Sequence, residues 1–404
     1  MKILIAHNDY AKYSGEEAVV DKMASMFTEL GHQVVLLRMS TAGDRDSLKG
    51  KAKGFVAGLW CPSGVKAMRE MLEREQPDIV NVHNLYPYIS PAALRECKKR
   101  GVPVVMTVHN YRLVCPTGLF MRNNSSCEEC LKKGNEWACI KYNCENSALK
   151  SLGYAARNAL ARIRRHYMDC VDRFACLTSF QKQKLIEAGF PEEKLTVIPN
   201  SIDLKGGLPH APEVTDSPSY IAYSGRISHE KGVDIIIETA RRNPTLRFKL
   251  AGQVRDKELV ENLPQNVELM GFLSGDSLED FYRNASFFVM ASRCYEGFPM
   301  AIIEAARYGK PVIAPDHGGF TEIISSGDEN IGLLFKPGNI DDFEQKVLSL
   351  WQDRNLISQL GRKAFEKLQK QYSTEVIAGK WERLLEEVIR QRRGIAAAPQ
   401  GWCR

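Results

Sequence analysis

Short apolar runs alternate with longer amphipathic stretches through the first half of the chain. Continuous runs rich in Val, Ile and Leu predict buried strands, whereas apolar residues at helical spacing predict helices. We expect strands at residues 2–6, 33–38, 78–83, 102–108, 174–178 and 195–198, with helices at 16–30, 91–100, about 147–167 and 179–188. Strands separated by helices indicate right-handed βαβ units and a parallel sheet.

The alternation stops at residues 205–218, where glycines, prolines and polar residues are typical of a linker. It then restarts, with strands expected at 220–224, 248–251, 267–271, 287–291 and 312–314, and a helix from Val233. The chain is helical again from Ile340, and residues 374–392 form an amphipathic helix that carries Trp381. This pattern predicts an α/β fold with two doubly wound domains, at 1–204 and 219–373, joined by a linker at 205–218. The first domain has an insertion at 112–146, and a C-terminal helix and tail follow at 374–404.

Length and composition agree with two folded domains. A chain of 404 residues exceeds the usual size of a single core, and 44% apolar with 26% charged residues is typical of globular proteins. No apolar run is long enough for a membrane span, and the first residues predict a strand rather than a signal peptide, so we expect a cytoplasmic protein. The net charge of +6 suits an anionic substrate or membrane face and does not by itself indicate nucleic acid as a partner.

Two carboxylates flank a predicted strand-to-helix transition. Glu296 lies in the loop after the strand at 287–291, and Glu304 lies about two turns into the helix that follows Pro299. Ligands of α/β sheets bind at the carboxyl ends of the strands, and a helix N-terminus there can hold a phosphate. Carboxylates on either side of a bound diphosphate would accept hydrogen bonds from the hydroxyls of a ribose and a sugar.

A second candidate site follows the first strand of the second domain. Gly225 would let the backbone approach a ligand, and Arg226 and Lys231 could converge on one anion across the next turn. The alternative is an ordinary solvated turn. We favour the anion site because it lies at the same sheet edge as Glu296 and Glu304.

The motifs together resemble the retaining glycosyltransferases of family 4, which have the GT-B architecture. The resemblance is carried by Gly-Arg-x-x-x-Glu-Lys-Gly from Gly225 and by Glu-Gly-Phe-Pro-x-x-x-x-Glu-Ala from Glu296. Further matches are Gly31-His32-x-Val, Thr107-Val108-His109, Pro199-Asn200-x-Ile-Asp203, Gly318-Gly319-Phe-Thr-Glu322 and Gly332-Leu-Leu-Phe, so the resemblance covers nearly the whole chain. It implies two Rossmann-like domains facing a central cleft, with the C-terminal helix crossing back to the first domain.

The resemblance also implies a role for each matched residue. Arg226 and Lys231 would hold the diphosphate of a nucleotide-sugar, Glu304 the ribose, and Glu296 a hydroxyl of the transferred sugar. His109 would face that sugar from across the cleft, although a lone histidine at a strand end is more often structural. The residues expected to contact the donor are Gly15, Asn200, Gly225, Arg226, Lys231, Gly297, Phe298, Pro299 and Glu304.

One departure from the family pattern lies in the loop after the first strand. The family has two adjacent glycines where this chain has Ser14-Gly15, which puts the contact between Gly15 and a phosphate in doubt. Two cations and a helix N-terminus can stabilise a nucleoside diphosphate leaving group, so no cofactor is required for catalysis. Asp44-Arg45-Asp46 has the spelling of a metal-binding motif but lies in a polar loop far from the other motifs, and we attribute it to chance.

Five of the 11 cysteines lie between residues 115 and 144. An odd number of cysteines in a chain without an export signal argues against a disulfide framework. The pair Cys127-x2-Cys130 could bind a structural zinc together with two further cysteines, or all five could be buried, reduced thiols. In a related subset of the family the ligands would be Cys115, Cys127, Cys130 and Cys144, leaving Cys139 over.

Two stretches of the first domain are both basic and apolar. They are residues 49–60, and the helix at about 147–167 with Lys150, Arg157, Arg162, Arg164 and Arg165. Such a surface suits peripheral binding to an anionic membrane, and a solvated helix face is an equal alternative.

The sequence therefore predicts a retaining glycosyltransferase that moves a sugar from a nucleotide-sugar to a glycan or lipid-linked acceptor in cell-surface polysaccharide synthesis. Three rivals remain open: a nucleotide-sugar epimerase, a phosphorylase of the same architecture, and a non-catalytic binding protein.

Overall fold

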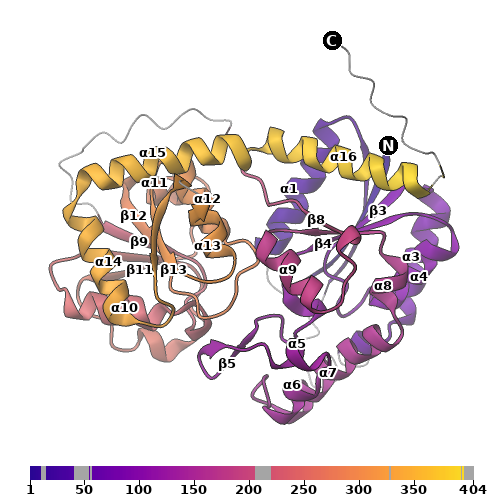
Figure 1. The fold of residues 1–404 in the computed structure, drawn as a ribbon, viewed down its shortest axis with the longest axis horizontal. Coiled ribbons are helices and arrows are strands. Elements are labelled where there is room, and N and C mark those ends of the chain that lie inside the picture. The colour runs from indigo at the N-terminus through magenta and orange to yellow at the C-terminus, as the bar shows by residue number, and fades with distance from the viewer. Residues whose placement is uncertain are drawn as a thin grey trace.

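The computed structural model of the chain describes residues 1–10, 15–40, 54, 57–204, 220–326, 329–392 and 394. They form two six-stranded sheets, each with buried apolar clusters on both faces, and the two α/β units lie side by side (Figure 1). The two Rossmann-like domains expected from the sequence are confirmed. The predicted linker at 205–218 and the Asp44-Arg45-Asp46 loop lie outside the described residues.

The first sheet has the strand order β2-β1-β3-β4-β7-β8, and all neighbouring strands are parallel. Successive side chains of a strand point to opposite faces, so Leu4 and Ala6 of β1 enter one buried cluster and Ile3 and Ile5 the other. The strands are β1 (Lys2–Asp9), β2 (Gln33–Ser40), β3 (Ile79–Val82), β4 (Val104–Val108), β7 (Arg173–Cys176) and β8 (Leu195–Val197). Each overlaps a strand that the sequence predicts.

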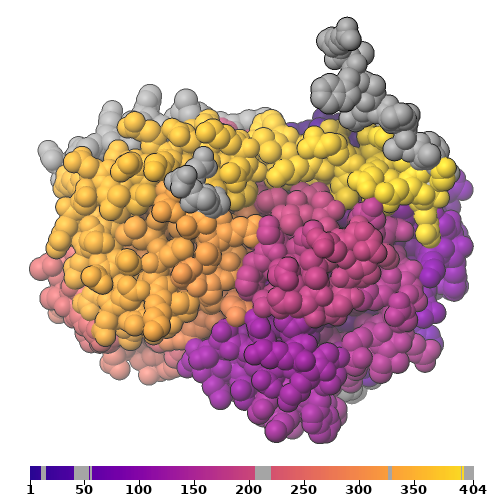
Figure 2. Space-filling model, in the orientation of Figure 1, coloured from indigo at the N-terminus to yellow at the C-terminus, as the bar shows by residue number. Residues whose placement is uncertain are grey.

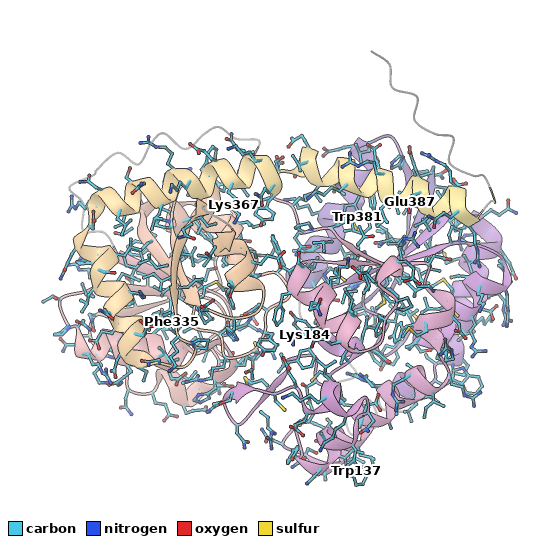
Figure 3. The ribbon with its side chains drawn as sticks, viewed as in Figure 1. Trp137, Lys184, Phe335, Lys367, Trp381 and Glu387 are labelled. Atoms are coloured by element: carbon cyan, nitrogen blue, oxygen red, sulfur yellow. The ribbon has the colours of Figure 1, made fainter. Side chains whose placement is uncertain are left out.

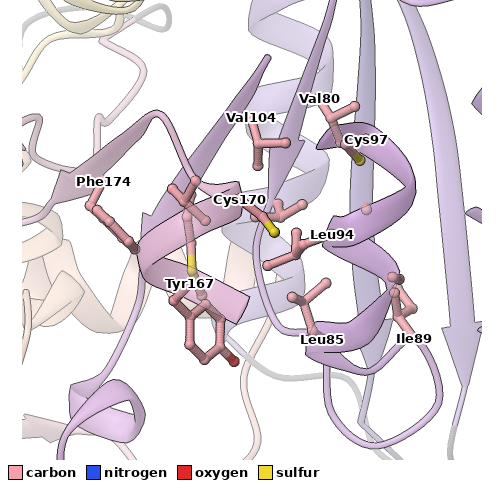
Figure 4. Close-up of a cluster of buried hydrophobic side chains, with 14 of the residues drawn as sticks. Val80, Leu85, Ile89, Leu94, Cys97, Val104, Tyr167, Cys170 and Phe174 are labelled. Carbon is pink, nitrogen blue, oxygen red and sulfur yellow. The ribbon is translucent and has the colours of Figure 1, made fainter. Parts of the chain in front are cut away.

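Helices cover both faces of this sheet. They are α1 (Gly15–Glu29), α3 (Pro62–Glu75), α4 (Leu94–Lys99), α7 (Ala148–Ile163), α8 (His166–Cys170) and α9 (Ser179–Glu187), with 3-10 turns η1 (Pro91–Ala93) and η3 (Glu192–Lys194). The sequence analysis did not predict α3. Figure 4 shows α4 and α8 packed on one face, with Val80, Leu85, Ile89, Leu94, Cys97, Val104, Tyr167, Cys170 and Phe174 in the cluster.

The predicted helix at 147–167 is divided into α7 and α8. Arg165 adopts a left-handed backbone conformation with φ 53°, which ends one helix and starts the next. Arg157, one of the basic residues of this stretch, is only partly exposed. Its Nε is buried, and its guanidinium lies 3.9 Å from the centre of the Tyr154 ring.

The second sheet has the order β11-β10-β9-β12-β13-β16, again with parallel neighbours. Its strands are β9 (Tyr220–Ser224), β10 (Phe248–Ala251), β11 (Val267–Gly271), β12 (Ala285–Val289), β13 (Val312–Pro315) and β16 (Gly332–Phe335). The helices are α10 (Val233–Arg242), α11 (Asp276–Asn284), α12 (Met300–Arg307), α13 (Gly319–Ile324) and α14 (Ile340–Gln352), with 3-10 turns η4 (His229–Lys231) and η5 (Lys257–Val260). Two short strands, β14 (Ser325–Ser326) and β15 (Glu329–Asn330), pair antiparallel.

Two C-terminal helices connect the domains. Helix α15 (Arg354–Gln371) packs on the second domain, and α16 (Thr374–Arg392) crosses to the first, as the band along the top of Figure 1 shows. Trp381 points from α16 into the first-domain core, where its ring meets that of Phe27 edge to face at 5.9 Å (Figure 3). The predicted crossing is confirmed. None of the described helices combines the length and the apolar composition needed to cross a bilayer.

The cysteine-rich insertion forms a small lobe of its own at the lower edge of the molecule (Figure 2). It contains the hairpin β5 (Met121–Arg122) and β6 (Ser125–Ser126), helices α5 (Glu129–Lys133) and α6 (Trp137–Lys141), and the 3-10 turn η2 (Tyr111–Leu113) at its start. The lobe contacts the second domain through Tyr295, whose ring lies 5.9 Å from that of Phe120. The insertion therefore touches both domains.

Candidate functional site

The loops that follow β4 and β12 meet between the two domains. A Cβ atom at Gly297 would lie only 3.0 Å from the carbonyl oxygen of His109 and 3.2 Å from Nε2 of Gln181. The Tyr111 hydroxyl also donates to the Glu296 carbonyl oxygen over 3.4 Å. The structure thus brings together His109 and the Glu296-Gly297 loop, which the sequence places in different domains.

Glu296 forms a buried ion pair with Lys231. The ammonium of Lys231 contacts Oε1 of Glu296, and the two side chains are only 14% and 15% exposed. The Ser292 hydroxyl donates to the same oxygen over 2.7 Å. Two of the predicted site residues are therefore direct partners at the carboxyl edge of the second sheet.

Burial and pairing act in opposite directions on this ion pair. Burial raises the pKa of Glu296, but the Lys231 charge and the hydrogen bonds outweigh it, so the pKa is lower than its ordinary value. Burial lowers the pKa of Lys231, but Glu296 outweighs that effect and the pKa is raised. Both groups are therefore charged near neutral pH.

A glycine allows this pairing. Gly232 has φ 65°, and a Cβ atom there would lie 1.9 Å from the carbonyl oxygen of Ala291, at the end of β12. Only glycine fits such a contact, since any side chain would push the η4 turn away from the strand. The close approach holds Lys231 beside Glu296.

Arg226 lies at the more exposed side of the same site. Its side chain is 41% exposed and pairs with Glu230 over 3.1 Å, and its charge acts on both Lys231 and Glu296. The preceding Gly225 has φ 155°, and a Cβ atom there would lie 2.9 Å from the Tyr223 hydroxyl. Arg226, Lys231 and Glu296 thus share one electrostatic site.

Glu304 lies elsewhere in the cleft. Its carboxylate accepts a hydrogen bond from the Tyr282 hydroxyl over 2.6 Å, and burial raises its pKa. Lys22 of α1 acts on the same carboxylate from the first domain and donates to the Ser201 carbonyl oxygen over 3.1 Å. Glu304 therefore faces α1 rather than the Lys231–Glu296 pair.

The other predicted donor contacts occupy different positions. Phe298 is buried with its ring 5.5 Å from that of Tyr372, and Pro299 precedes α12 as its N-cap. Gly15 is the exposed first residue of α1, and the preceding residues 11–14 lie outside the described part, so its phosphate contact remains a prediction. Asn200 lines a separate cavity of ≈ 20 Å³ between α1 and α16.

Residues that the sequence analysis did not single out surround His109. Nε2 of His109 lies 2.6 Å from Nδ1 of His83, and the His83 ring stands edge to face with that of His7. Burial lowers the pKa of His109 to about 4, and it lowers that of His83 well below the ordinary value, so both are neutral near pH 7. The sequence could have pointed to these histidines by their positions, since each lies near the carboxyl end of one of the adjacent strands β1, β3 and β4.

Glu322, which the sequence placed in a motif without a role, joins the domains. Both carboxylate oxygens of Glu322 accept hydrogen bonds from the backbone of α9, over 2.9 Å from Ser179 and 3.0 Å from Phe180. An acid at a helix N-terminus satisfies unpaired N–H groups and the helix dipole. Glu322 belongs to the Gly318-Gly319 motif, and Gly319 also packs closely on the Glu296 and Gly297 carbonyl oxygens.

The five clustered cysteines converge on one cavity of ≈ 10 Å³, lined by Cys115, Cys127, Cys130, Cys139 and Cys144. The thiols of Cys139 and Cys144 interact, which lowers the pKa of Cys144 and raises that of Cys139. The groups of three or more ligand atoms within 4.8 Å of one another in the described residues are His7-Asp9-Glu17 and His229-Asp256-Glu258. The cysteines thus fit zinc in type and number, but their sulfurs are spread more widely than the ~3.8 Å of a tetrahedral thiolate site.

Comparisons with known proteins agree with this geometry. Residues 13–205 match the model of Glycosyltransferase Family 4, and residues 210–367 match that of Glycosyl transferases group 1. A 42.6 kDa protein of the Klebsiella pneumoniae cps region is 25% identical over 393 residues, covering 87% of this chain and 96% of that protein.

Solved structures share the fold. Sucrose-phosphate synthase from Thermosynechococcus elongatus superposes with a TM-score of 0.73 at 16% identity, covering 96% of this chain and 99% of its own. Anabaena HepE, solved in complex with UDP-glucose, gives a TM-score of 0.65 at 15% identity, covering 96% and 100%.

The ion pair predicts a pH-dependent loss of stability on Glu296→Gln. Because the pKa of Glu296 is depressed below 4.5 in the folded chain, its stabilisation is present above that pH and disappears as the pH falls through the folded value. We expect a loss on the order of 3 kcal/mol at about pH 7 that shrinks steadily in acid, measured by urea unfolding. Glu230→Gln, in the more exposed pair with Arg226, is the control and should lose under about 1 kcal/mol. A Glu296→Gln deficit that is constant with pH would contradict the pairing.

Proposed function

Because the chain belongs to glycosyltransferase family 4, whose members retain anomeric configuration and typically need no metal, we propose that it transfers a hexosyl residue to a glycan or lipid-linked acceptor. The donor is a nucleotide-sugar, as in the family. UDP-glucose, the ligand of the Anabaena protein, is the first donor to test.

The observation that carries this proposal is the Lys231–Glu296 pair with Arg226 beside it. A diphosphate entering the cleft would compete for Lys231 and Arg226, whose positive charges stabilise the negative charge that develops on the leaving group. Glu296 would then be free to accept a hydrogen bond from a hydroxyl of the transferred sugar. The pair keeps both groups ionised and positioned before the donor arrives.

Glu304 and His109 complete the proposed donor site. The Glu304 carboxylate has one oxygen bound to Tyr282 and would accept hydrogen bonds from the ribose hydroxyls. His109 is neutral, and its contact with His83 occupies one ring nitrogen, so the other is left to orient the sugar. Retention fits attack by the acceptor on the face from which the nucleotide departs.

Lys231→Ala and Glu304→Ala should each reduce kcat/KM for transfer about a hundredfold or more, because each removes a charged contact with the donor. Nucleotide release in the presence of acceptor measures the rate, and the change in Tm on adding each nucleotide-sugar of a panel measures donor binding.

Lys336→Ala and Glu366→Ala are matched controls on the exposed surface of the second domain. Full activity in the Lys231 or Glu304 variant would end the assignment. A product assay separates the rivals, since an epimerase converts donor without acceptor.

The acceptor is proposed from the setting of the relative and from an exposed surface on the insertion and α7. The cps relative suggests a polysaccharide pathway. Trp137, Leu149, Leu152 and Ile163 are 46–68% exposed, with exposed basic residues Lys150, Arg164 and Arg165 nearby in the sequence. Trp137 lies at the lower tip of the molecule in Figure 3. Such a surface suits peripheral contact with the anionic inner face of a membrane.

The chain should co-sediment with phosphatidylglycerol vesicles and not with phosphatidylcholine vesicles. Ile163→Glu should weaken this binding about tenfold or more, since it puts a negative charge in the apolar surface. Leu269→Glu is the control. It changes an exposed apolar residue on the second domain and should leave binding unchanged. Equal sedimentation with both lipids, or none at low salt, would count against membrane binding.

A structural zinc in the insertion is proposed from the cavity that the cysteines line. Cys115, Cys127, Cys130 and Cys144 would hold it by their thiolates, leaving no open position for chemistry. Purified protein should release about one zinc per chain to a chelator. Cys130→Ser should lose the metal and Cys139→Ser should keep it. A fully folded protein purified without metal would refute the site.

A further inference from the structure

Arg112 is a half-buried cation whose direct hydrogen-bond partners are neutral. It lies in η2, directly after β4 and His109, and its Nη1 donates to the Asn84 side-chain oxygen over 3.2 Å and to the Tyr10 hydroxyl over 3.4 Å. Its Nε is buried without a hydrogen-bond partner. Glu16 is not within ion-pair distance of it, since the Tyr10 hydroxyl, which donates to Glu16 over 3.0 Å, lies between them. Burial lowers the pKa of Arg112, but Tyr10 and Glu16 outweigh that effect and the pKa is raised, so Arg112 is charged.

Arg157 of α7 is also a half-buried cation with neutral direct partners. Its guanidinium lies over the rings of Tyr154 and Tyr86, 3.9 Å and 4.6 Å from their centres, and donates to the Pro116 carbonyl oxygen over 3.1 Å. Its Nε is also buried without a partner. The next residue, Asn158, donates to the carbonyl oxygen of Arg112 over 2.6 Å, which ties α7 to η2.

The two arginines are near enough to repel each other. Among the described residues no carboxylate lies within ion-pair distance of either guanidinium, in contrast to Arg38 with Asp9 and Arg293 with Asp234. Glu145 acts on both only at longer range. Buried charges in proteins are normally paired, because an unpaired one loses its hydration without compensation. Two neighbouring cations without an ion-paired acid in the described part of the chain therefore point to a bound anion.

The position of these groups connects them to the cleft. Arg112 lines a cavity of ≈ 30 Å³ together with His83, His109, Asn84 and Glu16. His109 in turn contacts Gly297 of the second domain. Arg112 therefore lies beside the first-domain wall of the proposed reaction site, and Arg157 lies behind it on α7, which is tied to Arg112 through Asn158.

We propose that Arg112 and Arg157 bind an anionic group of the acceptor, next to the hydroxyl that attacks the donor. This inference rests on the proposed function and narrows its acceptor to an acidic one. Arginine binds phosphate and carboxylate through parallel N–H donors, and the polar cavity beside it suits sugar hydroxyls. The anion has two chemical sources, the diphosphate of a lipid-linked acceptor or the carboxylate of an acidic sugar.

The probes are inorganic pyrophosphate for the first source, glucuronate for the second and glucose as the neutral control, with binding measured by calorimetry at about 0.15 M salt. The full chain carries Lys231→Ala, so that the donor diphosphate site contributes less. We expect one of the two anions to bind, and Arg112→Gln or Arg157→Gln to weaken it about tenfold or more, as loss of a charge-assisted contact does. Arg362→Gln, an exposed arginine on α15 with no assigned role, is the control and should leave the Kd unchanged.

Arg157→Lys keeps the charge but loses the planar fork, and it replaces the glutamine variant if that one does not fold. It should weaken binding less than Arg157→Gln does. Binding of either anion that is equal in the Arg157→Gln, Arg112→Gln and parent proteins, or no binding of either anion, would overturn the proposal.

The measurement needs no donor, so the two proposals fail separately. If no nucleotide-sugar raises the Tm of the wild type while the arginine-dependent anion binding persists, the proposed transfer is wrong and the anion site stands. If donors bind and neither anion does, the reverse holds.

Discussion

The contact between Gly232 and the carbonyl oxygen of Ala291 is the constraint on which the site depends. It brings the η4 turn against the end of β12, where no side chain would fit, and so brings Lys231 to Glu296. Lys231 and Glu296 must lie this close together because a buried charge is tolerated only beside a partner of opposite charge. Both residues follow strands of one parallel sheet, whose carboxyl ends meet at one edge, so backbone packing rather than side-chain flexibility positions the charges.

The same edge must also face the first domain. Glu322 caps α9, and Gly297 lies against His109. Helices α15 and α16 connect the two domains, and between these helices the carbonyl oxygen of Tyr372 accepts a hydrogen bond from the Ile202 N–H. The contacts of Glu322 and Gly297 are small and polar, whereas those along α16 are apolar, with Trp381 and its neighbours buried. Such a distribution anchors the domains at one end and leaves exchangeable hydrogen bonds where a ligand would enter.

Much of the fold could be predicted from the sequence because strands of a buried parallel sheet are continuous apolar runs. The break between α7 and α8 could not, since the left-handed residue there is Arg165 and neither glycine nor proline marks it. The site residues were identified by motif, but their pairing was not. Lys231 and Glu296 were assigned to different parts of a donor, and without that donor their opposite charges bind each other. The position of Arg157 could not be predicted, because an amphipathic pattern does not show that its guanidinium lies over the rings of Tyr86 and Tyr154.

The cysteine-rich insertion is part of the cleft rather than an appendage. Tyr111 and Phe120 pack with Phe180 of α9 and Tyr295 of the second domain, and Lys184 of α9 pairs with Glu128 of the insertion over 2.8 Å. Arg112 lies at the start of this insertion, one residue after Tyr111, whose hydroxyl binds the Glu296 carbonyl oxygen. Order in the insertion therefore bears directly on both walls of the cleft, and a cross-link through its cysteines would stiffen the segment that carries the unpaired cation.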